Sequence, residues 1–104
     1  MVTVYGRYVI HDPSATEAFE ESTRRFVDFG RSREGNVSFS LGPDMFDPST
    51  IHMVQIWESR ELFEKFTATP EHDQRIEETK AFGAAGQVTR DDLIFFEGDI
   101  YRRV

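Results

Sequence analysis

Residues 51–58, IHMVQIWE, are the stretch that most limits how this chain can fold. Their β-branched and aromatic side chains favour a strand, and alternate side chains of a strand point to opposite faces. Met53, Gln55 and Trp57 then share one face, while Val54 and Ile56 lie on the other. Both faces are largely apolar, so both need cover. Helices of the same chain can cover one face of the sheet, and the other face needs a further layer.

The rest of the pattern predicts the order β-α-β-β-α-β with the second helix split in two. Ser14 is the expected N-cap of the first helix and Gly30 its expected C-cap. Ser59 can cap the second helix, and Thr69-Pro70 is a typical opening for the third, which should end near Phe82. This order predicts an α+β, ferredoxin-like βαββαβ fold with an antiparallel four-stranded sheet. The expected strands are residues 2–10, 35–41, 51–58 and 93–101.

Composition narrows the class of protein. A chain of 104 residues is expected to form one domain, residues 1–104. A net charge of −7 argues against a nucleic-acid partner, and no stretch approaches the roughly 20 apolar residues of a membrane span. The absence of cysteine excludes disulfides and thiolate metal sites and, with no signal peptide evident, suggests a cytoplasmic protein. The sheet face left uncovered predicts a homodimer, because isologous twofold pairing is the commonest assembly.

Two polar residues suggest a small-molecule site. Gln55 would sit beside Trp57 in an apolar layer, where a buried amide needs a protein partner, water or a ligand. His72, in the first turn of the third helix, could face the same space and move a proton, or could simply be exposed. The three histidines show no metal-binding spacing, so no bound metal is expected.

Several segments, taken in order, resemble the antibiotic biosynthesis monooxygenase (ABM) domain. They are Glu34-Gly35, the strand NVSFSL, a loop containing Asp-Pro, the strand end VQIWES, an aromatic helix and Thr-Pro-Glu-His. The resemblance covers nearly the whole chain and implies a single ABM-like domain that forms a dimeric α+β barrel. It also implies oxidation of a small aromatic substrate, a quinol or an anthrone, by O2 without metal, haem or flavin.

The resemblance assigns roles to residues of this chain. Trp57 is implied as a pocket wall and possible hydrogen-bond donor. Gln55 stands where relatives often carry Glu, and His72 matches the histidine of the Pro-His segment, which makes it the candidate proton acceptor. The remaining substrate-binding candidates are Phe39, Phe63 and Phe66.

The chain also departs from the family pattern. Many relatives carry a histidine on the helix after the tryptophan, where Phe63 and Phe66 stand here, and Met53 replaces an asparagine of some members. Two other functions therefore stay open. One is a non-catalytic small-molecule-binding or stress-response barrel. The other is a haem-degrading monooxygenase, although Tyr5-Gly6-Arg7 lacks the first-strand asparagine usual in that branch.

Overall fold

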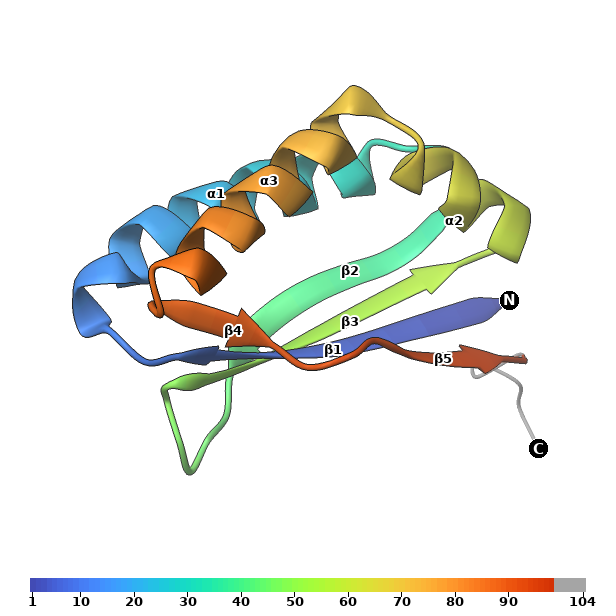
Figure 1. The fold of residues 1–104 in the computed structure, drawn as a ribbon. Coiled ribbons are helices and arrows are strands. Elements are labelled where there is room, and N and C mark those ends of the chain that lie inside the picture. The colour runs from blue at the N-terminus through green and yellow to red at the C-terminus, as the bar shows by residue number, and fades with distance from the viewer. Residues whose placement is uncertain (99–104) are drawn as a thin grey trace.

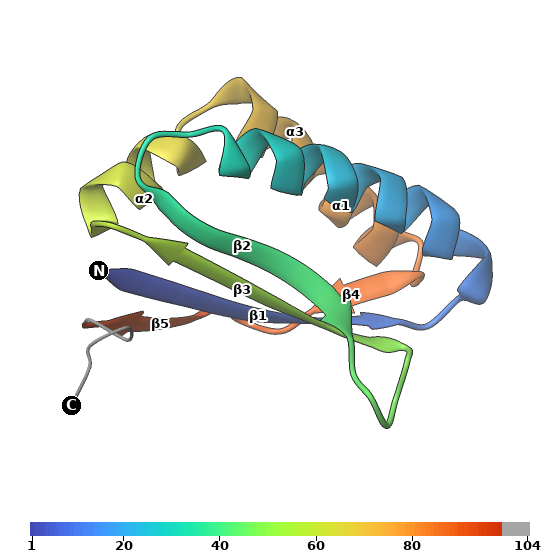
Figure 2. The ribbon, with the colours of Figure 1, turned by 180° about the vertical axis from the view of Figure 1, so that it is seen from behind.

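The computed structural model describes residues 1–98. An antiparallel sheet carries three α-helices on one face (Figure 1), and the opposite view shows α1 and α3 side by side above the strands (Figure 2). The strand order is β2-β3-β1-β4, and β5 also pairs with β1. The predicted α+β, ferredoxin-like class is confirmed. The elements are β1 (Val2–Ile10), a 3₁₀ turn η1 (Pro13–Ala15), α1 (Thr16–Arg31), β2 (Asn36–Pro43), β3 (Thr50–Trp57), α2 (Arg60–Thr67), α3 (Pro70–Ala84), β4 (Val88–Arg90) and β5 (Ile94–Glu97).

The predicted two-faced strand is β3, which pairs with β1 on one side and β2 on the other. Trp57 lies opposite Val2, and Gln55 lies opposite both Val4 and Phe39. All five side chains are buried, and they share the helix-covered face of the sheet. The sequence-based assignment of alternate β3 side chains to the two faces of the sheet was therefore correct.

Two of the predicted helix starts are confirmed by hydrogen bonds. The Ser59 hydroxyl accepts the backbone N–H of Leu62 at 3.2 Å and caps α2. The Thr69 hydroxyl accepts the backbone N–H of His72 at 3.2 Å, with Pro70 in the first turn of α3. Each cap satisfies a backbone donor that has no partner within its helix.

Both predicted ends of α1 were wrong. Asp12 caps the 3₁₀ turn instead, and Ser14 donates its hydroxyl to Asp12 at 2.8 Å, so α1 begins at Thr16 without a side-chain cap. Gly30 lies inside α1, which continues to Arg31. Glycine is needed there for space, because a Cβ would lie 2.5 Å from two ring carbons of Phe39.

The sheet has five strands within residues 1–98, not the predicted four. The additional strand is β4, three residues that pair with the end of β1 (Val88 opposite Ile10). The helix before it, α3, runs to Ala84, two residues beyond the predicted end. The predicted last strand, 93–101, is present as β5, and its final residues lie outside the described part of the chain.

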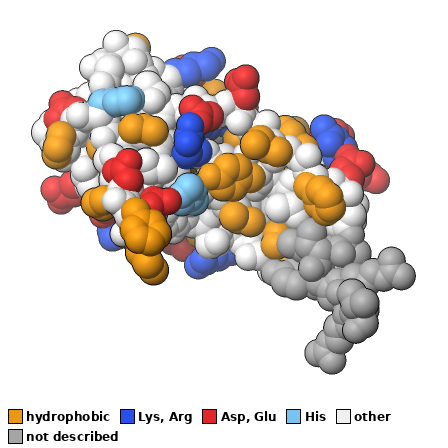
Figure 3. All heavy atoms as spheres, turned by 90° about the horizontal axis from the view of Figure 1, so that it is seen from below, with side chains coloured by type: hydrophobic (Ala, Val, Ile, Leu, Met, Phe, Trp, Pro, Cys, Tyr) orange, Lys and Arg blue, Asp and Glu red, His pale blue; other side chains and the backbone are white. Residues whose placement is uncertain are grey.

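The other face of the sheet carries no helix among the described residues. Hydrophobic side chains are spread over it, interrupted by charged groups and histidine (Figure 3). Ile94 and Phe96 belong to this face and are 62% and 57% exposed. The loop between β2 and β3 adds Met45 and Phe46, the most exposed large apolar side chains of residues 1–98. This surface motivates the predicted homodimer, which remains a prediction.

Candidate functional site

The aromatic residues predicted from the sequence lie together between the sheet and α2. Trp57 stacks on Phe66 with ring centroids 4.9 Å apart, and Phe63 packs against Trp57 at 6.2 Å. Phe39 meets the edge of Phe66 at 6.1 Å. These four rings are buried. The cluster is a packed layer that accounts for the ring-rich composition of this half of the core.

Gln55 finds partners within its own strand. Its side-chain oxygen accepts the indole N–H of Trp57 at 3.1 Å, and its amide nitrogen donates to the sulfur of Met53 at 3.5 Å. A thioether is a weak acceptor. The amide oxygen is therefore well satisfied and the amide nitrogen is not, which leaves one buried donor able to bind a better acceptor.

His72 borders the same cluster from α3. Its ring lies 5.2 Å from Phe66 and 5.7 Å from Phe26, centroid to centroid. Burial lowers the pKa of His72 below its ordinary value of 6.5; the cations Arg90 and Arg75 lower it further and Asp73 opposes them. The imidazole is therefore neutral at pH 7 and can accept a proton.

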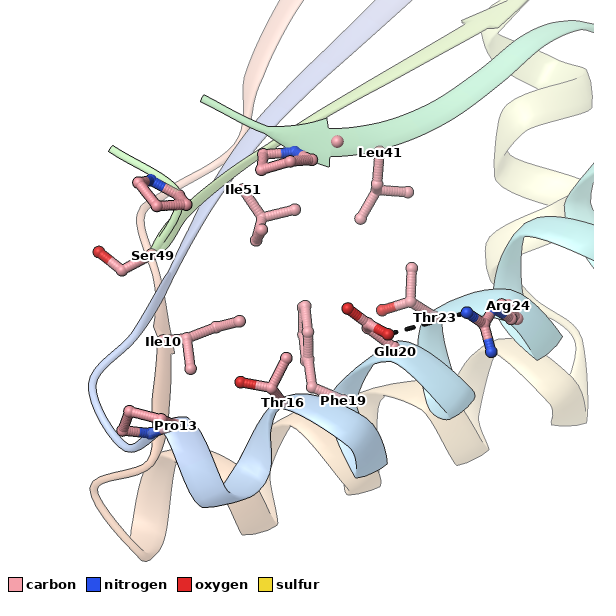
Figure 4. A pocket seen from close by; sticks show the side chains of 13 residues that line it. Ile10, Pro13, Thr16, Phe19, Glu20, Thr23, Arg24, Leu41, Ser49 and Ile51 are labelled. Atoms are coloured by element: carbon pink, nitrogen blue, oxygen red, sulfur yellow. Dashed lines mark ion pairs between the residues drawn. The ribbon is translucent and has the colours of Figure 1, made fainter. Parts of the chain in front are cut away.

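A cavity of about 620 Å³ lies between α1 and the opposite end of the sheet. Figure 4 shows side chains of α1, among them Phe19 and Thr23, facing Leu41 and Ile51 of the strands across an open space. The volume falls within the range of small-molecule sites. None of the six residues predicted from the sequence lines it. The lining is Ile10, Pro13, Thr16, Phe19, Glu20, Thr23, Arg24, Leu41, Gly42, Pro43, Pro48, Ser49 and Ile51.

The cavity is mostly apolar with a few polar groups on the α1 side. Glu20 and Arg24 form an ion pair at 3.7 Å, and both side chains are largely exposed. The hydroxyl of Thr23 is buried and has no hydrogen-bond partner among residues 1–98. An unpaired buried hydroxyl is destabilising.

The cavity and the aromatic cluster are neighbours in one layer. Leu41 lines the cavity and Phe39, two residues earlier on the same face of β2, belongs to the cluster. On α1, Thr23 lines the cavity and Phe26 packs edge-on against Phe39 at 5.1 Å. The cluster therefore lies beside the cavity in the same layer, although none of its rings forms part of the cavity wall. Sequence reasoning missed the cavity because one wall comes from β1, η1 and α1 and the other from β2, β3 and the loop between them, which are distant along the chain.

Sequence reasoning also missed Arg75, because a charged residue on a polar helix is usually exposed. Arg75 is only 2% exposed. Its Nη1 donates to the hydroxyl of Ser22 at 2.7 Å, and its Nε and Nη2 are buried without a hydrogen-bond partner in the described chain. The available signal was the spacing of His72, Arg75, Thr79 and Phe82, all at least partly buried, at steps of three and four residues.

A separate polar chain lies on the helix-free face. The Tyr5 hydroxyl lies 2.5 Å from Nδ1 of His52, and Nε2 of His52 lies 2.8 Å from a carboxylate oxygen of Asp44. Hydrogen bonds from His52 and from the backbone of Phe46 lower the pKa of Asp44. As a carboxylate, Asp44 accepts from Nε2, so Nδ1 accepts from Tyr5. The hydrogen bonds Tyr5–His52 and His52–Asp44 thus hold the loop between β2 and β3 against the sheet.

Within residues 1–98, no group of three or more histidine, cysteine or acidic side chains is arranged to hold a metal ion. None of the helices there has the length and apolar character needed to cross a membrane. The candidate site comprises the apolar cavity, the aromatic cluster beside it and the His72–Arg75 face of α3.

A sequence comparison shows which protein family this chain belongs to. The model of the antibiotic biosynthesis monooxygenase domain matches residues 1–78, three quarters of the chain. The chain belongs to this family. No curated protein matches it in sequence.

Solved structures show the same fold at low sequence identity. A Deinococcus radiodurans protein assigned as an antibiotic biosynthesis monooxygenase aligns with a TM-score of 0.85 and 16% identity, covering 100% of this chain and 98% of its own. Rv0793 from Mycobacterium tuberculosis aligns at 0.79 and 16%, covering 97% and 98%. SnoaB from Streptomyces nogalater, a cofactor-independent oxygenase, aligns at 0.73 and 19%, covering 94% and 92%.

Proposed function

We propose that this ABM-domain protein is a cofactor-independent monooxygenase that oxidises a small aromatic substrate of the quinol or anthrone type with O2. The observation that carries the proposal is that, in a chain of this family, an apolar cavity of about 620 Å³ lies in the same layer as a cluster of aromatic rings bordered by His72, a half-buried histidine whose pKa is lowered by burial. The chemistry of SnoaB, a structural relative, is consistent with it.

The reaction balances without a cofactor when the substrate supplies the electrons. For an anthrone, a base removes one proton from the ring CH2 group and leaves an electron-rich enolate. The enolate gives its electrons to O2, and a carbon–oxygen bond forms to give a peroxide. Cleavage of the O–O bond then leaves a carbonyl oxygen on carbon and releases the second oxygen as water. The protein needs only to bind the ring, accept the proton and exclude water.

His72 is the proposed proton acceptor. Burial keeps its imidazole neutral at pH 7, which leaves one ring nitrogen free to take a proton. Its contacts with Phe26 and Phe66 place it at the border of the aromatic cluster, where a planar substrate advancing from the cavity would arrive.

The aromatic cluster is the proposed inner wall of the substrate site. Trp57 and Gln55 belong to this wall, and the weakly bonded amide nitrogen of Gln55 is available to a substrate oxygen. A planar ring can stack where the rings of the cluster now stack on each other, with displacement of a side chain. The other proposed wall residues are Phe39, Phe63 and Phe66.

Oxygen uptake by metal-stripped protein, measured with a panel of anthrones and quinols, tests the proposal. We expect uptake above the spontaneous rate, with one O2 consumed per anthrone. His72→Ala should lower kcat by about 10²–10⁴-fold. His11→Ala is the matched control, because His11 is exposed and its side chain bonds only Thr89 of β4 among the described residues.

Uptake that equals the spontaneous rate with every substrate would contradict the proposal. Ligand binding without turnover would then favour the non-catalytic binding protein as the function of this chain. Turnover that survives His72→Ala unchanged would keep the enzyme and remove His72 from the proton path.

A further inference from the structure

The buried arginine of α3 has an unused pair of hydrogen-bond donors. Arg75 Nη1 is occupied by Ser22, whereas Nε and Nη2 have no partner among residues 1–98. The N–H bonds of Nε and Nη2 leave the guanidinium on the same edge and run nearly parallel, which is the side-on fork that matches the two oxygens of a carboxylate. The free edge is therefore the one suited to a planar two-oxygen anion.

Within residues 1–98, no carboxylate is bonded to Arg75. Its Cζ lies 5.0 Å from the centroid of Phe26, 5.1 Å from Phe19 and 5.5 Å from Tyr8. Cation–π contacts with these rings offset part of the cost of burying the charge, but they supply no acceptor oxygen. A buried charge without a partner is the arrangement that proteins avoid unless a ligand completes it.

A small hollow adjoins Arg75 directly, and the larger cavity lies on the other side of Phe19. The hollow, about 170 Å³ between α1 and α3, includes Arg75 in its wall, but it is smaller than the roughly 300–1,000 Å³ of small-molecule sites and also carries the carboxylates Glu71 and Glu78, the latter paired with Arg25. The larger cavity contains one carboxylate, Glu20, which is paired with Arg24. The cavity is therefore the better source of an anionic ligand.

Phe19 connects Arg75 to the larger cavity. Its ring packs against the Arg75 guanidinium, and the same residue lines the cavity wall. Phe19 thus separates the Arg75 guanidinium from the larger cavity, and a change of its rotamer would open the guanidinium edge to a ligand in the cavity. Rotation of one buried ring is a local rearrangement of the kind seen when a site receives its ligand.

We propose that Arg75 is a binding residue for an aromatic carboxylate in the cavity, held by Nε and Nη2. The inference rests on the proposed function, and it names the substrate class of that site: an aromatic ring that carries a carboxylate. His72 lies one turn before Arg75 and both pack on Phe26, so an anion held by Arg75 would set the ring beside the proposed proton acceptor.

The test compares the affinities of 2-naphthoate and 2-naphthamide, which share ring and shape but differ in charge. Calorimetry on the full chain should show naphthoate binding at least about tenfold more tightly. Arg75→Met should abolish this preference and also raise the melting temperature, because an apolar side chain of similar length replaces an unpaired buried charge. A purely structural arginine would lower the melting temperature when lost. Arg25→Met, which removes the same charge from the exposed side of α1, should leave the preference intact.

Equal affinities of the two ligands for the wild type, or no binding of naphthoate, would overturn the proposal. So would an undiminished preference in Arg75→Met. If Arg75→Met does not fold, Arg75→Lys is used instead, since lysine keeps the positive charge but lacks the paired N–H donors of the guanidinium. An undiminished preference for naphthoate in Arg75→Lys would also overturn the proposal. Naphthoate has no oxidisable CH2 group, so these outcomes do not depend on whether the protein turns over a substrate.

Discussion

Gly30→Ala should destabilise the fold, although alanine in a helix interior normally stabilises it. The added Cβ would lie 2.5 Å from two ring carbons of Phe39. Phe39 is only 1% exposed and touches Phe26 and Phe66, so its ring cannot yield freely. Overpacking of this kind costs about 1–3 kcal/mol, against a propensity gain of up to about 1 kcal/mol. The expected net loss reaches about 2 kcal/mol.

Gly83→Ala supplies the control for this variant. Gly83 is also helical, and the nearest atom to an added Cβ is the Val88 carbonyl oxygen at an ordinary 3.7 Å. Urea unfolding should show Gly83→Ala at least as stable as the wild type and about 1–3 kcal/mol more stable than Gly30→Ala. Equal stability of the two variants would refute the claim that Phe39 fills the space beside α1.

Three further outcomes are expected. Folding lowers the pKa of His72, so below about pH 6.5 the unfolded chain binds a proton that the folded chain does not, and the free energy of unfolding should fall as the pH drops. Urea titrations should show a shallower fall in His72→Gln but not in His11→Gln. Trp57→Phe leaves the Gln55 oxygen without its donor and should lower the free energy of unfolding by about 1–3 kcal/mol beyond the effect of the lost volume. Adding Gln55→Leu to the same chain should recover part of this stability. Additive losses of stability in this double-mutant cycle would contradict the hydrogen bond. Light scattering at micromolar concentration should report a dimer, because the helix-free face is apolar, and a stable monomer would contradict that use of the face.

Sequence reasoning succeeded where the deciding interactions are local. The caps by Ser59 and Thr69 follow from residues three positions apart, and the burial of Trp57 and Gln55 follows from strand parity. It failed where a distant partner decides. Gly30 is a common C-cap residue, but it serves here to admit the ring of Phe39 from β2.

The candidate site was only partly readable from the sequence, for the same reason. The aromatic residues were singled out because the resemblance implied Trp57 as a pocket wall, with Phe39, Phe63 and Phe66 beside it, whereas the cavity depends on how α1 packs over distant strands. Arg75 was missed because a charged residue on a polar helix usually points to solvent, and its burial follows from packing against α1.

The central claim is that this chain inserts oxygen from O2 into an aromatic substrate without a metal or organic cofactor. The most direct test is mass spectrometry of the product formed from an anthrone under ¹⁸O2 by chelator-treated protein. The account predicts a quinone with one labelled oxygen, formed faster than in buffer, and a loss of rate when Leu41→Trp fills the cavity. Labelled product formed only at the rate seen in buffer would contradict it.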